Sequence, residues 1–191
     1  EVVSKAVDEM SQGELLQIEK ARKLNINEEV YFKIIEQKTA ALIAACVKAG
    51  ALSVQAGQDA INDMEEFGMC LGLAFQIKDD LFDYEPNGLS GKPSGNDIKE
   101  KKMTLPLIHV KDKLSAAERR KILRLLKKKH KSKKEVLGLI SLVEEHGGID
   151  YAREKMESYK QKALDILDKY PDSPHKNSLK EIVEYTVQRK K

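Results

Sequence analysis

One segment of small and apolar residues, from Phe67 to Phe75, constrains the fold more than any other feature of this chain. It contains no charged residue, so a helix over it would be hydrophobic on all sides, and such a helix is normally buried. The polar residues of the following turns share one face of the same helix, at spacings of three, four and seven: Gln76, Asp79, Asp80 and Asp83. The sequence therefore predicts a central, buried helix that ends in an acidic face.

The acidic face is a DDxxD pattern that needs compensating positive charge. Three carboxylates on one face repel one another, and burying ionised groups without partners is very costly. Mg²⁺ that bridges carboxylates to the phosphate oxygens of a substrate would relieve both problems. The pattern thus predicts Asp79, Asp80 and Asp83 as metal ligands, although a solvated acidic helix end remains the simpler alternative on this spacing alone.

The segment that follows, residues 84–97, is rich in glycine and proline and is expected to be a loop. It carries Lys92, and Lys102 follows shortly before Thr104, a plausible N-cap of the next helix. Ammonium groups beside a carboxylate-bound metal suit a polyphosphate, because they take the phosphate charge that the metal leaves. Taken singly, a lysine in a loop is more simply read as a plain surface residue.

These residues resemble a known family. The sequence FQIKDDLFDY (75–84), followed by GKPSGNDIKEKKMTLPLI (91–108), closely resembles the second aspartate-rich motif and the following loop of the trans-isoprenyl (polyprenyl) diphosphate synthases. The resemblance extends to residues 13–17, 38–42 and 147–152, and so covers most of the chain. One departure is Lys101, because the family usually has glycine before the lysine that matches Lys102.

The resemblance implies an activity and a set of site residues. The family condenses an allylic diphosphate with isopentenyl diphosphate to give a longer trans-polyprenyl diphosphate, with Mg²⁺ as cofactor. By resemblance, Asp79 is the best metal ligand, and Asp80 and Asp83 support it directly or through water. Lys38, Lys92 and Lys102 would hold the allylic diphosphate.

The resemblance also implies which groups face the allylic cation. These are the Lys38 backbone carbonyl, the Thr39 hydroxyl and the Gln76 side-chain oxygen, so Lys38, Thr39 and Gln76 are the catalytic candidates. Without the resemblance, Lys38 on an apolar helical stripe would simply extend its ammonium group to the nearest water. The basic end 189–191 resembles a tail that folds over the isopentenyl diphosphate site, with a frayed terminus as the alternative.

A second DDxxD motif is absent from the 191 residues. The family needs a first such motif, with arginines beside it, for further Mg²⁺ and for isopentenyl diphosphate. We therefore expect a longer natural protein with N-terminal helices that this chain lacks, and no appreciable synthase activity from the chain alone. The alternatives are a non-catalytic partner subunit of a heteromeric prenyl synthase, a class I terpene cyclase, and a purely structural helical bundle.

Composition favours helices throughout. The chain has 11 glycines, 5 prolines and no tryptophan, and its commonest residues are good helix formers. Helices are expected at about 1–22, 28–50, 54–85, 104–112, 115–130, 133–146, 148–170 and 176–189. The prediction is one all-α domain over residues 1–191, an isoprenoid synthase-type bundle, and the family resemblance implies a homodimer.

Charge and cysteine content exclude several other classes. The net charge of +3 conceals many charges of both signs, so no general field for nucleic acid or membranes arises. The basic run 127–134 lacks interleaved aromatic residues and is expected to be a solvated helix junction. Cys46 and Cys70 lie in apolar helical patterns and are expected as reduced core residues. No stretch looks like a signal peptide or reaches the roughly 18 apolar residues of a membrane span, so we expect a cytoplasmic protein.

Overall fold

The computed structural model describes residues 1–85 and 95–189, apart from the side chains of Arg22 and Lys23. All regular elements in these ranges are helices, so the all-α prediction is confirmed. They are α1 (Val2–Lys23), α2 (Glu28–Ile35), the π-helical segment η1 (Glu36–Ala40), α3 (Ala41–Ser53), α4 (Gln58–Phe82), α5 (Asn96–Lys99), α6 (Leu105–Lys113), α7 (Ala116–Lys127), α8 (Lys133–Glu145), α9 (Gly148–Asp168) and α10 (Pro174–Gln188).

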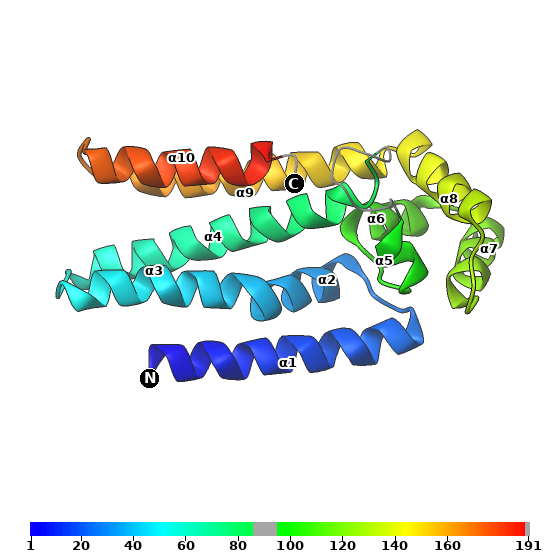
Figure 1. Ribbon diagram of the computed structural model, residues 1–191, viewed down its shortest axis with the longest axis horizontal. Helices are drawn as coiled ribbons and strands as arrows, with labels where there is room; N and C mark the ends of the chain where they lie inside the picture. Colours follow the sequence, from blue (N-terminus) through cyan, green and yellow to red (C-terminus); the bar gives the residue numbers. More distant parts are fainter. Residues whose placement is uncertain (86–94, 190–191) are drawn as a thin grey trace.

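The long helices run side by side along the longest axis of the molecule (Figure 1). Helix α1 packs on η1 and α3, these pack on α4, and α4 packs on α9 and α10. The shorter helices α5 to α8 gather at one end of this array (Figure 1). Helix α4 is therefore the central element of the bundle, and its C-terminal end points toward the group of short helices.

Helix α4 is central because its middle, residues 67–75, has no charged or strongly polar side chain on any face. Phe67 and Ile77 are fully buried, and so are most of the residues between them. The middle of α4 packs against α9 and α10 through Phe67, Leu71, Ala163 and Val183. Each fully buried large apolar side chain contributes roughly 1.5–3 kcal/mol. The expected buried helix is confirmed.

The helix expected over 28–50 is a continuous rod with an irregular middle. Helix α2 begins after Asn27, whose side chain accepts a hydrogen bond from the backbone of Val30. In η1 the backbone N–H of Ala41 donates to the carbonyl of Glu36, five residues earlier, and α3 then continues to Ser53. The sequence pattern predicts the rod but not this π-helical turn.

Several predicted helix ends differ from the observed ones. Helix α4 begins at Gln58 rather than at residue 54, because Gly57 has an extended backbone (ψ 155°). The four-residue helix α5 was not expected within the loop. Residue Thr104 does precede α6, but its hydroxyl bonds to that of Tyr84 instead of capping the helix.

The remaining fold predictions divide between confirmed and wrong. The basic run 127–134 spans the exposed junction between α7 and α8, as expected. Cys70 is buried, but Cys46 is exposed on α3, so its placement in the core was wrong. The helical stripe that carries Cys46 faces away from α4, on the opposite side from Ala44. None of the described helices is long and apolar enough to cross a membrane.

Candidate functional site

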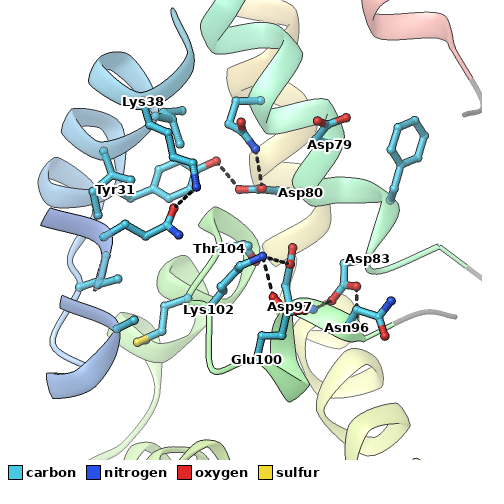
Figure 2. A pocket seen from close by; sticks show the side chains of 18 residues that line it. Tyr31, Lys38, Asp79, Asp80, Asp83, Asn96, Asp97, Glu100, Lys102 and Thr104 are labelled. Atoms are coloured by element: carbon cyan, nitrogen blue, oxygen red, sulfur yellow. Dashed lines mark hydrogen bonds and ion pairs between the residues drawn. The ribbon is translucent and has the colours of Figure 1, made fainter. Parts of the chain in front are cut away.

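A cavity of about 460 Å³ lies where α1, α2, η1 and the C-terminal end of α4 meet the segment 96–104 (Figure 2). Its lining combines many carboxylates with two lysines and a few apolar side chains. The charged residues in the lining are Lys38, Asp79, Asp80, Asp83, Asp97, Glu100 and Lys102. The acidic face predicted from the sequence therefore opens into a pocket rather than into bulk solvent.

Asp80 is buried and has a hydrogen-bond donor on each carboxylate oxygen. The Tyr31 hydroxyl donates to Oδ2 at 2.7 Å and Gln76 Nε2 donates to Oδ1 at 3.1 Å. Burial outweighs these bonds and raises the pKa of Asp80 to about 7. Burial, together with the charge of Asp80, also raises the pKa of Tyr31. In Figure 2 the Asp80 carboxylate points at the Tyr31 hydroxyl, while Asp79 lies farther from it.

The Asp80 contacts continue to Thr39. Its hydroxyl donates to the Gln76 side-chain oxygen at 2.9 Å, which leaves the Gln76 amide nitrogen for Asp80. The oxygen of Gln76 that the resemblance directs at an allylic cation is thus bonded to Thr39 in this structure. One hydrogen-bonded chain, Tyr31–Asp80–Gln76–Thr39, links α2, α4 and η1.

Asp83 connects the end of α4 to α5. Its carboxylate accepts hydrogen bonds from the backbone N–H groups of Asn96 (2.7 Å) and Asp97 (3.1 Å). Burial, followed by the nearby charge of Asp97, raises the pKa of Asp83. Asp83 therefore places the acidic end of α4 next to the acidic residues of the segment 96–104.

Asp79 is paired with the end of α10. The Arg189 guanidinium donates to Asp79 Oδ1 at 2.5 Å. The same guanidinium lies 4.2 Å from the Phe75 ring centre and 5.3 Å from that of Phe82, distances typical of cation–π contacts. The two lysines after Arg189, at positions 190 and 191, lie outside the described residues.

The two described site lysines are also paired with acids. Lys102 Nζ lies 3.1 Å from Asp97 Oδ1 and 2.8 Å from Glu100 Oε2. Burial lowers the pKa of Lys102, but its bonds to these two acids outweigh burial and leave the pKa raised. Lys38 Nζ lies 2.7 Å from Glu14 Oε2. Lys92, the third lysine predicted to bind diphosphate, lies outside the described residues.

Lys101 has a left-handed backbone, with φ +64°. Non-glycine residues rarely adopt this conformation because their Cβ crowds the following carbonyl. The position at which the sequence departs from the resembled family is therefore one where glycine would fit more easily.

The structure thus brings most of the predicted residues to one cavity. Lys38, Gln76, the three aspartates and Lys102 line it, and Thr39 is joined to it through Gln76. Within residues 1–85 and 95–189, however, no three acidic, histidine or cysteine side chains converge closely enough to hold a metal ion. The chemistry of the donors still fits a hard cation, because Asp80 and Asp83 have raised pKa values that a nearby positive charge would lower.

Sequence reasoning missed several residues of this site: Glu14, Tyr31, Asp97 and Glu100. Tyr31 had a usable signal, because it is a hydroxyl-bearing residue on the otherwise apolar stripe of α2 that also faces α4. Glu14, Asp97 and Glu100 lie within residues 13–17 and 91–108, the segments that carry the resemblance. The approach of these segments depends on tertiary packing.

Comparison with known proteins places the chain in a family. The family model described as Polyprenyl synthetase matches residues 1–143. A short chain isoprenyl diphosphate synthase of Methanothermobacter thermautotrophicus is 33% identical over 98% of this chain, which covers 58% of that relative. The chain thus spans little more than half the length of the curated relatives it matches.

Solved structures agree with this. The geranylgeranyl pyrophosphate synthase of Bacteroides thetaiotaomicron has a TM-score of 0.89 and 39% identity to this chain. The match covers 98% of this chain and 62% of the chain of that synthase. A polyprenyl synthase from Caulobacter crescentus CB15, complexed with calcium and isoprenyl diphosphate, has a TM-score of 0.91 and 29% identity to this chain. The match covers 100% of this chain and 58% of the chain of that synthase. The isoprenoid synthase-type fold is confirmed, and the chain belongs to the polyprenyl synthetase family.

Proposed function

We propose that the protein containing this chain is a Mg²⁺-dependent prenyltransferase that condenses an allylic diphosphate with isopentenyl diphosphate into a longer trans-polyprenyl diphosphate. The observation that carries the proposal is the single cavity onto which the DDxxD aspartates, Lys38, Lys102 and Gln76 all open. Family membership supports the reaction class. Carboxylates and lysines around one space suit a substrate that is both highly anionic and metal-bound.

Asp79 and Asp83 are the ligands that we assign to the metal, with Asp80 behind them. Asp80 already has a donor on both oxygens, so it suits a supporting place better than direct ligation. When bound, Mg²⁺ supplies positive charge that stabilises the departing diphosphate. For Asp79 to contribute Oδ1 to the metal, the Arg189 guanidinium has to move away from that oxygen.

The lysines hold the diphosphate through its remaining charge. Lys38 and Lys102 face the cavity from opposite elements, η1 and the segment before α6. Each now pairs with acidic residues, and phosphate oxygens of higher charge would replace these partners. Lys92 completes the predicted set from outside the described residues.

The reacting carbon needs an environment with dipoles but without nucleophiles. The apolar side chains of Ile26, Ile34 and Ile35 line the cavity beside Gln76 and exclude water from that side. The oxygens of Thr39 and Gln76 are fixed by their mutual bond, so they offer oriented dipoles to a developing positive charge. We name no protein base, because the released diphosphate suits that role. The homodimer remains a prediction from the resemblance, and the cytoplasmic location remains a prediction from the sequence, in which no signal peptide or membrane-length apolar stretch is recognised.

The experiment is an assay of the purified product of the complete reading frame with an allylic diphosphate, isopentenyl diphosphate and Mg²⁺. We expect prenyl diphosphates lengthened by five-carbon units, and loss of product with Asp79→Asn. A cyclised hydrocarbon made without consumption of isopentenyl diphosphate would replace the proposal with a terpene cyclase. Activity that appears only with a second subunit, and survives Asp79→Asn, would make this chain a non-catalytic partner.

A further inference from the structure

The π-helical segment η1 sets which residues of the α2–η1–α3 rod face α4. Tyr31 and Thr39 are eight residues apart, which in a regular α-helix would turn them about 80° away from each other. One extra residue in a π-helical turn reduces this to about 20°. Both side chains therefore face α4, where Asp80 and Gln76 lie one turn apart. Asp80 accepts a hydrogen bond from the Tyr31 hydroxyl, and Gln76 accepts one from the Thr39 hydroxyl.

Two glycines allow neighbouring helices to press directly on η1. A Cβ added at Gly72 of α4 would lie 2.5 Å from the Ala40 Cα, and one at Gly13 of α1 would lie 2.7 Å from the Lys38 backbone nitrogen. Such distances are closer than side-chain carbons tolerate, so any larger residue here must displace the η1 backbone. The π-helical turn is thus held from two sides, at the residues that flank Thr39.

A third glycine makes an equally close contact away from η1. A Cβ at Gly68 would lie 2.6 Å from the Ala44 Cα, one turn farther along the same α3–α4 packing. Close packing of α4 on the rod is therefore not special to Gly72. What distinguishes Gly72 and Gly13 is that they touch the segment that carries Lys38 and Thr39.

We propose that Gly13 and Gly72 are positioning residues: by holding the π-helical turn of η1 they keep Lys38 directed at the diphosphate and Thr39 bonded to Gln76. The inference rests on the proposed function, because it concerns the same site. It assigns a role to backbone contacts that neither the motif nor the cavity lining includes. Displacement of a reacting group by about 1 Å is enough to cost roughly a hundredfold in rate.

The test compares Gly72→Ala with Gly68→Ala, two equally crowded substitutions on one helix, each made in the product of the complete reading frame. We expect both to lower the unfolding temperature by a similar amount. Gly72→Ala should lower kcat at least tenfold with little change in KM, whereas Gly68→Ala should leave both constants within about twofold of wild type. Equal kinetic losses in the two variants would overturn the proposal. Gly50→Ala, whose Cβ meets nothing within 4 Å, controls for the loss of a glycine in a helix.

A second variant covers the case in which Gly72→Ala does not fold. Gly13→Ala should weaken binding of Mg²⁺-pyrophosphate about tenfold, a change of roughly 1.4 kcal/mol, because it displaces the backbone of Lys38. Gly13→Ala and Thr39→Val should also be non-additive in kcat, since both act on the same segment. Additive effects, together with unchanged pyrophosphate binding, would contradict the proposal.

A crystal structure of metal-free Gly13→Ala separates this inference from the proposed function. We expect the Thr39–Gln76 hydrogen bond to be broken there and kept in Gly68→Ala. If wild-type protein neither binds Mg²⁺-pyrophosphate nor turns over prenyl substrates, the proposed function fails, but the two crystal structures still decide whether the glycines position η1. An intact Thr39–Gln76 bond in Gly13→Ala would refute the positioning role.

Discussion

The guanidinium of Arg189 lies against the carboxylate of Asp79, although the two residues are 110 positions apart in the chain. It also contacts the rings of Phe75 and Phe82, so three residues from the end of α4 hold it in place. Asp79 is the residue that the motif designates first for metal binding. Arg189, at the end of α10, therefore occupies one of the two oxygens of the carboxylate that we propose for the metal.

Arg189→Ala should tighten metal binding, because the cation no longer competes with a guanidinium for Asp79. We expect the affinity for Mn²⁺ in the presence of pyrophosphate to rise about two- to fivefold, in line with the modest energy of a partly exposed ion pair. Isothermal calorimetry measures this directly. Arg153→Ala, which removes an exposed pair with Asp150 on α9, should have no effect. Weaker binding in Arg189→Ala would mean that Arg189 helps to hold the ligand instead.

Tyr31→Phe should destabilise the protein more than Tyr84→Phe does. Both hydroxyl groups are buried, but the Tyr31 hydroxyl bonds to the Asp80 carboxylate and the Tyr84 hydroxyl bonds to the neutral hydroxyl of Thr104. Hydrogen bonds to charged groups contribute about 1.5–3 kcal/mol, against about 0.5–1.5 kcal/mol for neutral pairs. Urea unfolding at pH 8, where Asp80 with its pKa of about 7 is ionised, compares the two variants. Equal losses would show that the Tyr31–Asp80 bond is not charge-assisted.

The sequence predicts the bundle and the acidic end of α4 because both depend on local patterns. The apolar segment 67–75 has one stable placement, inside the bundle, and the DDxxD spacing then fixes which face its carboxylates share. The partners of those carboxylates come from elsewhere: Tyr31 from α2, Asn96 from α5 and Arg189 from the end of α10. Their approach depends on how the helices pack, and the spacing of residues along the sequence does not predict it.

The π-helical turn shows the same limit at the level of the backbone. The apolar stripe of residues 28–50 predicts one continuous helix, and the rod is indeed continuous. Gly13 of α1 and Gly72 of α4 lie directly against η1. A pattern within the rod alone contains no trace of those contacts.

Lys101→Gly should stabilise the protein. The left-handed backbone of Lys101 costs a non-glycine residue about 1–2 kcal/mol of folding free energy, and glycine avoids this cost. Glycine also loses more conformational entropy on folding, which offsets part of the gain. We expect a net gain of about 0.5–1 kcal/mol relative to Lys101→Ala, which removes the same charge but keeps a Cβ. Chemical denaturation of the two variants isolates the backbone effect. A Lys101→Gly variant no more stable than Lys101→Ala would show that the strain is absent.

The Asp63 carboxylate should make stability fall at acid pH. Its hydrogen bond from Lys169, followed by that from Tyr170, holds the pKa of Asp63 below the usual value. Because the folded-state pKa is the lower one, the stabilisation is fully present above the unfolded-state pKa of about 4. It is lost as the pH falls through the folded-state value.

Asp63→Asn should therefore unfold at a lower temperature than wild type at pH 7. This difference in unfolding temperature should shrink toward pH 2. Lys169→Met removes the main partner and should show the same trend. Thermal unfolding followed by circular dichroism from pH 7 to pH 2 measures it. A difference that stays constant over this range would show that the Asp63 contacts do not favour the ionised carboxyl.

Calorimetric titration of inorganic pyrophosphate into the protein, with Mg²⁺ and then with a chelator, tests the central claim most directly. The claim is that the cavity at the end of α4 binds a diphosphate through a metal held by the motif aspartates. We expect binding only with Mg²⁺, at least tenfold weaker in Asp79→Asn and unchanged in Asp59→Asn, which alters an exposed acid at the other end of α4. Binding that persists without a divalent cation, or that is indifferent to Asp79→Asn, would contradict the account.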